Sequence, residues 1–365
     1  MSRSSIVVAL ASVLLAACSS HAADATGEAP DAASDGSGGG GGQDATSEPA
    51  IDGGVVPLIT EPDQGMQPIY DFISSATKTL DMTMYEMDDP QVTALLTKAA
   101  ASGVTVRVIL DQNDEKTANT PAYNALSAAS VAVHWANPTY ACTHQKTITV
   151  DGTTSAVMTL NLAPEDYKTS RDFAVITTDA ADIAAIESVF DADFTSTAVI
   201  PDIGDNLVWS PTNSETALLD LINGAKTSLL VENEEMSYDA IVSALTQAAS
   251  RGVDVEVVME NSSSYQTEFT TLVNSGVKLA TYEHASLYIH AKIILADYGT
   301  SGAQVFIGSE NFSHASLTEN RELGLVTTDP GVMASLHTTL TSDFAGGTTF
   351  GAPAPTSAAD AGTSD

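Results

Sequence analysis

An internal duplication is the feature that most restricts how this chain can fold. Three pairs of segments match between its two halves: AASGVTVRVIL (100–110) with AASRGVDVEVVM (248–259), SRDFAVITTD (170–179) with NRELGLVTTD (320–329), and SVFDADF (188–194) with TLTSDF (339–344). Equivalent residues are 149 or 150 positions apart: Gly103 and Gly252, Arg171 and Arg321, Phe194 and Phe344. This nearly constant offset predicts two copies of one fold, joined near residues 200–207.

Each copy has the same alternation of helical and strand patterns. In each, an amphipathic helix (66–77; 213–225) precedes an apolar strand (79–85; 227–232), and a second helix (90–102; 238–251) leads into a Val/Ile-rich strand (104–110; 253–259). More strands follow, and a helix (180–194; 330–344) closes each copy. Helices that alternate with buried-type strands predict two homologous α/β sandwich halves. We expect these halves to pack about a pseudo-twofold axis.

Composition sets the boundaries of the two halves. Residues 22–54 consist almost entirely of Gly, Ser, Ala and acidic residues, and the C-terminus has a similar polar composition. Such segments bury too little apolar surface to fold. We therefore expect a signal segment at 1–18, a flexible acidic linker at 19–54, an N-terminal half at 55–202, a C-terminal half at 203–345 and a disordered tail at 346–365.

The N-terminus has the pattern of an export signal. One Arg precedes an apolar stretch from Ile6 to Leu15, which is too short to span a membrane. The stretch ends in Leu15-Ala16-Ala17-Cys18, which resembles the bacterial lipobox, and this predicts lipidation at Cys18 and an exported, outer-membrane lipoprotein on the periplasmic or surface face. The alternative is an ordinary signal, cleaved slightly later, and a secreted protein. The other cysteine, Cys142, is expected to be a small buried residue.

The chain is strongly acidic, which restricts its partners. Its formal net charge is −34, and residues 57–345 alone hold 38 acidic and 12 basic side chains. A field of this sign repels polyanions at long range, so broad, nonspecific binding of nucleic acid is disfavoured. A local cationic pocket remains compatible with this charge.

Two copies of one polar pattern lie in strand-like apolar segments at matching places in the duplication. THQKTITVDG carries His144, Lys146 and Asp151, and YIHAKIILAD carries His290, Lys292 and Asp297. In an extended segment the His and the Lys, two positions apart, point to the same face. A single His-x-Lys in a strand is usually a solvated polar face, but two copies at an offset of 146 indicate a shared site.

This H-x-K-x4-D pair resembles the phospholipase D superfamily, whose two-lobed members carry two such motifs. The resemblance covers nearly all of residues 57–345 and includes Gly308-Ser309-Glu310-Asn311, which is similar to the family's G-S-x-N. The first half departs from it with Met158-Thr159-Leu160-Asn161, where the Gly is absent and Thr replaces Ser. Since hydroxyl and amide are kept, we expect a working oxyanion environment of different shape.

The resemblance implies a role for each motif residue. His144 is the expected nucleophile that becomes a phosphohistidine, and His290 is the expected acid. Asp172 and Glu322 are implied as the acceptors that orient the histidines. The chemistry agrees, because a phosphodiester needs cationic donors around its oxygens. Lys146 and Lys292 carry such charges, while Asn161 and Asn311, with Thr159 and Ser309 beside them, supply neutral donors. Asp151 and Asp297 come at strand ends, where we expect them to stabilise turns.

The other polar residues, and other chemistry for the histidines, fit the sequence pattern less well. A zinc site is disfavoured because the histidines are matched with lysines rather than with further ligands. The other histidines have no repeat partner and are expected to be surface or structurally satisfied residues, with His314 the one candidate for the pocket. Tyr85-Glu86 and Glu234-Glu235 fall at equivalent strand ends, where polar residues are usually structural, although they are also placed to shape a headgroup pocket.

The function expected from these observations is a phospholipase D-type phosphoric diester hydrolase that acts without a cofactor or a metal. Its expected substrates are phospholipids or related small phosphodiesters, and a lipid anchor would hold the protein, as a monomer, beside a membrane. A nuclease and a phosphatidyl-transferase of the cardiolipin synthase kind are alternatives within the superfamily. An alternative of another class is a non-catalytic surface binding protein that reuses the fold.

Overall fold

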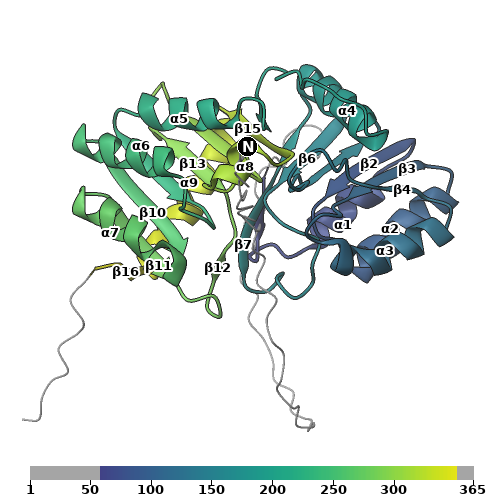
Figure 1. Ribbon diagram of the computed structural model, residues 1–365, viewed down its shortest axis with the longest axis horizontal. Coiled ribbons are helices and arrows are strands. Elements are labelled where there is room, and N and C mark those ends of the chain that lie inside the picture. The colour runs from purple at the N-terminus through teal and green to yellow at the C-terminus, as the bar shows by residue number, and fades with distance from the viewer. Residues whose placement is uncertain (1–57, 352–365) are drawn as a thin grey trace, which may run out of the picture.

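The computed structural model describes residues 58–351, which form two similar halves side by side (Figure 1). The predicted signal with Cys18, the linker at 19–54 and the last part of the predicted tail lie outside these residues. The elements of the first half are β1 (Leu58–Glu61), α1 (Gln67–Ser74), β2 (Thr79–Met84), α2 (Pro90–Ala101), β3 (Thr105–Leu110), α3 (Lys116–Ala128), β4 (Ala132–Trp135), β5 (Thr147–Val150), β6 (Thr154–Met158), β7 (Ser170–Thr177) and α4 (Ala180–Phe194).

The second half repeats this order with a few additions. Its elements are β8 (Leu207–Ser210), α5 (Ser214–Gly224), β9 (Ser228–Glu232), α6 (Asp239–Ser250), β10 (Asp254–Glu260), the 3-10 turn η1 (Ser263–Tyr265), α7 (Gln266–Asn274), β11 (Lys278–Tyr282), β12 (Tyr288–Ile289), β13 (Ile293–Ala296), β14 (Gln304–Gly308), α8 (His314–Thr318), β15 (Glu322–Thr327), α9 (Pro330–Gly346) and β16 (Thr348–Thr349).

The two sheets within residues 58–351 have the same strand order. The first runs β1-β7-β6-β5-β2-β3-β4, and the second runs β8-β15-β14-β13-β9-β10-β11, with β16 added at its edge. In each, the three strands that follow helices at one end are parallel, and the other strands of that order pair antiparallel. The first sheet also includes β12, which pairs with β7 in parallel. The prediction of two homologous α/β sandwich halves is therefore confirmed.

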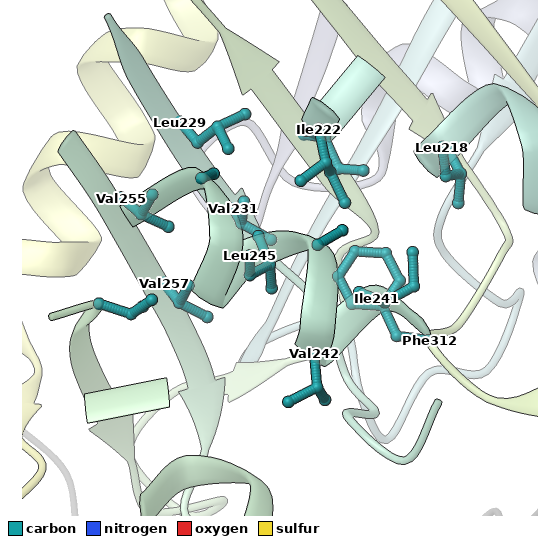
Figure 2. Close-up of a cluster of buried hydrophobic side chains, with 14 of the residues drawn as sticks. Leu218, Ile222, Leu229, Val231, Ile241, Val242, Leu245, Val255, Val257 and Phe312 are labelled. Carbon is teal, nitrogen blue, oxygen red and sulfur yellow. The ribbon is translucent and has the colours of Figure 1, made fainter. Parts of the chain in front are cut away.

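Three large apolar clusters form the core, one within each half and one between the halves. Helices α1, α2 and α3 cover one face of the first sheet, and α5, α6 and α7 cover the equivalent face of the second (Figure 1). Figure 2 shows the cluster in the second half, where Ile241 and Leu245 of α6 meet Val231, Val255 and Val257 of the sheet. A third cluster joins the inner faces of both sheets with α4 and α9, so the interface between the halves is itself a hydrophobic core.

Local sequence accounts for where several helices begin. The carboxylates of Asp89, Asp179 and Asp329 each accept hydrogen bonds from two backbone N–H groups in the first turn of α2, α4 and α9. Pro90 and Pro330 then occupy the first helical position, where a missing N–H costs nothing. The helices that the periodicity predicted therefore begin at residues that cap their N-termini.

Two expectations about boundaries differ from the structure. The tail was expected from residue 346, but α9 ends at Gly346 and β16 pairs with β11, so the first tail residues belong to the second sheet. The apolar run 288–297 was expected to be one strand, but it is divided into β12 and β13. The division arises because β12 pairs with β7 of the first half, whereas β13 pairs within its own sheet.

Candidate active site

Backbone pairing between the halves brings the two motifs together. Ile289 of β12 pairs in parallel with Arg171 of β7, and Thr143 forms the equivalent parallel bridge with Arg321. The motif histidine follows Ile289 and Thr143 in the sequence, and an acid follows Arg171 and Arg321. In Figure 1, β12 and β7 run next to each other at the centre of the molecule. This register places each histidine beside the acid of the opposite half.

The acceptors are therefore exchanged between the halves. His144 Nδ1 lies 2.8 Å from Glu322 Oε2, and His290 Nδ1 lies 2.8 Å from Asp172 Oδ1. All four side chains are buried. With Nδ1 donating its proton to a carboxylate, Nε2 of each ring is left for chemistry. The predicted acceptors Asp172 and Glu322 are thus in contact with the histidines. Each acid contacts the histidine of the opposite half.

Short polar side chains fix the two acids in turn. Glu322 Oε1 accepts hydrogen bonds from Ser316 Oγ at 2.6 Å and from Asn320 Nδ2 at 2.9 Å. Thr159 Oγ1 donates to Asp172 Oδ1 at 2.5 Å and accepts from the backbone N–H of Phe173. The hydroxyl predicted to stand near the substrate oxygens in the first half therefore holds the orienting acid.

Ser309, which was predicted to play the same part in the second half, also binds protein. Its Oγ accepts a hydrogen bond from the backbone N–H of Leu323 at 3.2 Å, which fixes the start of β15 next to Glu322. Ser309 and Thr159 are equivalent in this respect, since each accepts from the N–H that follows the acid. Both hydroxyls are therefore hydrogen-bonded to protein groups at or next to the acids, rather than directed toward a substrate position.

The protonation of His144 is biased by its surroundings. Burial and the charge of Lys146 lower the pKa of His144, although Glu322 acts in the opposite direction. Burial raises the pKa of Glu322, but the neighbouring His144 and the hydrogen bonds from His144, Ser316 and Asn320 lower it overall. A neutral imidazole whose Nδ1 proton is donated to a carboxylate carries its lone pair on Nε2, which is the form able to act as a nucleophile.

The two motif lysines are fully buried but have different neighbours. Lys146 Nζ donates to the carbonyl of His144 at 2.9 Å and lies 4.8 Å from the centre of the Tyr85 ring. Burial and the nearby Lys292 lower the pKa of Lys146 to about 8. Lys292 Nζ donates to the carbonyl of His290 and forms an ion pair with Glu234 at 3.0 Å. One lysine thus faces an aromatic ring and the other faces a carboxylate.

Glu234, which the sequence places at a strand end suited to shape a headgroup pocket but does not predict to be catalytic, is a member of the site. Its Oε2 lies 3.6 Å from His290 Nε2 and accepts from Asn311 Nδ2 at 3.2 Å, while its Oε1 accepts from Tyr288 Oη at 2.5 Å. Burial raises the pKa of Glu234, but Lys292 and His290 lower it well below its ordinary value. The signal in the sequence was its alignment with Tyr85, which lies equally close to the first motif.

The two asparagines lie at equivalent places. Asn161 lies beside Glu86, which follows Tyr85, and Asn311 lies beside Glu235, which follows Glu234. Asn161 Nδ2 lies 3.5 Å from Glu86 Oε2, and Asn311 Nδ2 lies 3.4 Å from Glu235 Oε1. The residue after each is buried in its own half; Figure 2 shows Phe312, which anchors the loop of Asn311. Burial and nearby acids raise the pKa of Glu86 to about 8, and burial and Glu234 raise that of Glu235 to about 7.

The aspartates of the motifs lie away from the histidines. Asp151 accepts hydrogen bonds from the backbone N–H groups of Thr77, Lys78 and Thr79, immediately before β2. Asp297 does the same for 226–228, before β9. Both have positive φ, at 54°, where Asp is tolerated. They stabilise turns, as expected, and make no contact with the reacting groups.

The remaining candidates also have defined places. Cys142 is buried, as expected for a small filler. His314 is exposed and lies 3.6 Å from Glu319, so it belongs to the surface rather than to the pocket. None of the helices within 58–351 has the length and apolarity to cross a bilayer. The same residues contain no cluster of three His, Cys, Asp or Glu side chains arranged to hold a metal ion.

Comparisons with known proteins agree with this geometry. A family profile described as "Cardiolipin synthase, PLD-like domain" matches residues 69–194 and again 218–344. Cardiolipin synthase A of Pseudomonas aeruginosa is 27% identical over 135 residues, which cover 35% of this chain and 26% of that protein. Phospholipase D Y of Dictyostelium discoideum is 34% identical over 92 residues, 24% of this chain and 20% of that protein. The chain thus matches only about a quarter of these relatives' length.

Solved structures support the fold across both halves. The crystal structure of phosphatidylserine synthase from Haemophilus influenzae superposes with a TM-score of 0.61 at 11% identity, covering 79% of this chain and 86% of that one. Polyphosphate kinase from Porphyromonas gingivalis also gives a TM-score of 0.61, at 16% identity, over 78% of this chain and 50% of that one. At these identities the likeness concerns architecture alone.

Proposed function

This chain belongs to the phospholipase D superfamily, with two PLD-like domains, and on that premise we propose that it cleaves phospholipid phosphodiester bonds through a covalent phosphohistidine. The observation that carries the proposal is the exchange of acceptors, which orients His144 and His290 by the same geometry from opposite halves. Two histidines held in this way provide a nucleophile and a proton donor around one phosphorus atom.

In the first step, Nε2 of His144 attacks phosphorus and the bond to the leaving oxygen breaks. His290 donates its proton to that oxygen, so the alcohol leaves neutral. In the second step, His290 removes a proton from water, and the oxygen of that water displaces His144 from phosphorus. Lys146 and Lys292 stabilise the charge on the phosphoryl oxygens in both steps, without a metal. The neutral state favoured for His144 and the two carboxylates around His290 support this assignment of roles.

Charge supports a lipid rather than a nucleic acid as the substrate. Residues 57–345 hold 38 acidic and 12 basic side chains, and this net negative charge disfavours holding a polyanion such as nucleic acid. The relatives named above are a cardiolipin synthase and a phospholipase D, whose names concern lipids. A lipidated Cys18 would keep such an enzyme beside its substrate, and an exported lipoprotein remains our proposal for its location.

Transfer to an alcohol is the second candidate for the outcome of the reaction. The matching family profile and several of the relatives are named for cardiolipin synthase. If this chain catalyses transfer, a lipid alcohol replaces water in the second step. Hydrolysis and transfer share the phosphohistidine, so they differ only in the acceptor. Incubation with a phospholipid and glycerol, followed by mass spectrometry of the lipids, separates phosphatidic acid from a transfer product.

The test of the mechanism uses a chromogenic phosphodiester with protein lacking residues 1–50, in the presence of EDTA. We expect turnover that His144→Ala abolishes. Because a nitrophenolate leaves without protonation, His290→Ala should still release one equivalent in a burst and then stall as the phosphohistidine. His134→Ala, at an exposed histidine, is the control. Wild-type turnover that persists in His144→Ala would rule the mechanism out.

A further inference from the structure

A small recess opens beside His290. Asp172, Ser170, Tyr167, Asp166 and Glu61 line it together with the His290 ring. The recess, at about 10 Å³, has room for about one water-sized group. In the reaction proposed above, the leaving alcohol departs from the His290 side, so this recess is next to that alcohol.

Polar atoms face the recess without partners. The Ser170 hydroxyl belongs to a residue 3% exposed, and it has no hydrogen-bond partner among the described residues. The carboxyl oxygens of Glu61, a residue 2% exposed, likewise have no partner at ordinary hydrogen-bond geometry within this part of the chain, and burial and the nearby Asp172 raise the pKa of Glu61 to about 7. Buried polar groups are rarely left unsatisfied in a native protein unless a ligand or water completes them. The Glu61 oxygens accept hydrogen bonds, and the Ser170 hydroxyl accepts as well as donates, so a donor placed in the recess would give all of them a partner.

The charge of the lining is negative. Glu61, Asp166 and Asp172 supply three carboxyl groups, and no lysine or arginine is among the described residues that line the recess. Arg171, the residue before Asp172, has its guanidinium engaged by Asp343, by Asp63 and by the carbonyl of Glu61. A second phosphate or another anionic group would therefore be repelled from this position.

We propose that this recess binds a primary ammonium on the leaving alcohol, so that the preferred substrates are phosphodiesters of an ethanolamine-type headgroup. The inference rests on the function proposed above and adds the substrate class. An –NH3⁺ group is about the size of a water molecule and has three donors for the carboxylates and the Ser170 hydroxyl. A trimethylammonium group is larger, has no N–H donor and is usually bound in a cage of aromatic rings. Here the only aromatic neighbours within the described lining are Tyr167 and the His290 ring.

The test compares headgroup release from vesicles of one acyl composition that contain ethanolamine, glycerol or choline phospholipid. We expect kcat/KM for the ethanolamine lipid to exceed that for the choline lipid by about tenfold or more, the range of one charged hydrogen bond. The glycerol lipid, with hydroxyl donors but no charge, should fall between them. Glu61→Gln and Ser170→Ala should each bring the ethanolamine-to-choline ratio toward one. Glu256→Gln, at a partly exposed ion pair with Lys278, should keep the wild-type ratio.

Turnover of a chromogenic phosphodiester separates the two levels of the proposal. If that diester is cleaved but ethanolamine and choline lipids react equally, or choline or glycerol lipid is preferred, the recess does not select an ammonium and this inference is wrong. If neither the diester nor any lipid is cleaved, the proposed function fails, and this inference fails with it. A wild-type ratio in both Glu61→Gln and Ser170→Ala would also overturn it, and circular dichroism of each variant confirms that it is folded.

Discussion

At the scale of single residues, the two halves of the site differ chiefly in what faces each lysine. Tyr85 in the first half and Glu234 in the second come from equivalent strand ends, yet one offers a ring to Lys146 and the other a carboxylate to Lys292. Glu234 contacts His290, Lys292 and Asn311, the groups that a phosphoryl oxygen would need. Its carboxylate therefore occupies the position of an anion, and a phosphate must compete with it.

Removing that charge should strengthen anion binding. In Glu234→Gln, we expect inorganic phosphate to inhibit chromogenic turnover with a Ki about tenfold lower than in the wild type, because one unfavourable interaction between like charges at close range is lost. The amide keeps an acceptor for Tyr288. Inhibition constants measured in both proteins, with Glu256→Gln as the control, decide the point. An unchanged or higher Ki in Glu234→Gln would contradict this account.

The buried lysine of the first motif should set an alkaline limit to activity. Burial and Lys292 lower the pKa of Lys146 to about 8, so its ammonium form is present below that pH and is lost as the pH rises through it. His144, with a lowered pKa, stays neutral over the same range. We therefore expect kcat/KM to fall above about pH 8. A profile that stays flat to pH 10 would show that the charge of Lys146 is not required.

The residues of this site were largely predictable, because histidine, lysine and asparagine recur at matching positions of a duplication. The contacts of Glu234 with His290 and Lys292, and most of the recess lining, were not. The repeat matches Glu234 to a tyrosine, so the sequence placed it near the pocket without assigning it these contacts. Ser170 is matched only to Asn320, and the pairing of β1 and β12 with β7 brings Glu61 and Ser170 near His290.

At the scale of elements, periodicity predicted the helices and the long apolar strands, while short strands escaped. β1 and β8 have four residues each, and their place is fixed by pairing with the distant β7 and β15. The division of 288–297 into β12 and β13 has the same cause, since its first residues pair with the other half. Apolar alternation alone does not reveal which of two sheets a residue joins.

The turn before β2 depends on one carboxylate. Hydrogen bonds from Thr77, Lys78 and Thr79, together with burial acting in the opposite direction, lower the pKa of Asp151 to about 2. Asp151→Ala should lower the free energy of unfolding by about 2 kcal/mol at pH 7, as expected for hydrogen bonds to a charged group. Asp151→Asn should cost less, since it tolerates positive φ and keeps one acceptor.

The effect of Asp151 should depend on pH in a defined direction. Its folded pKa lies below the unfolded value, so its contribution is complete above about pH 4 and is lost as the pH falls through about 2. Urea unfolding of wild type and Asp151→Ala at pH 7 and at pH 3 measures this. A difference in unfolding free energy that is larger at pH 3 than at pH 7 would show that the carboxylate form is not the stabilising one.

At the scale of the whole molecule, two crossed ion pairs join the halves. Arg171 of the first half binds Asp343 of the second at 2.6 Å, and Arg321 of the second binds Asp193 of the first at 2.9 Å. The four residues are buried, and each arginine directly precedes an acid that orients a histidine. Since the duplication predicted two equivalent halves but not which contacts cross between them, these pairs emerge only from the structure.

Breaking one of these pairs should be costly. Arg171→Ala leaves Asp343 buried without its partner, near Glu232, and we expect it to lower the free energy of unfolding by about 3–5 kcal/mol. The double variant Arg171→Met with Asp343→Leu should recover much of this loss, because no lone charge is then buried. Lys278→Ala, which removes an exposed pair, should cost no more than about 1 kcal/mol. Urea unfolding measures all three, and a double variant as unstable as Arg171→Ala would contradict this reasoning.

The exchange of acceptors between the halves has a practical consequence. Each motif histidine and the carboxylate that binds its Nδ1 come from opposite halves, so a chain whose halves are each folded but undocked has no nucleophile oriented in this way. Catalysis is then a direct reporter of docking. In a denaturant titration, turnover should be lost at a lower concentration than helical circular dichroism if the halves separate before they unfold. Coincident loss of both signals would mean that the molecule unfolds as one cooperative unit.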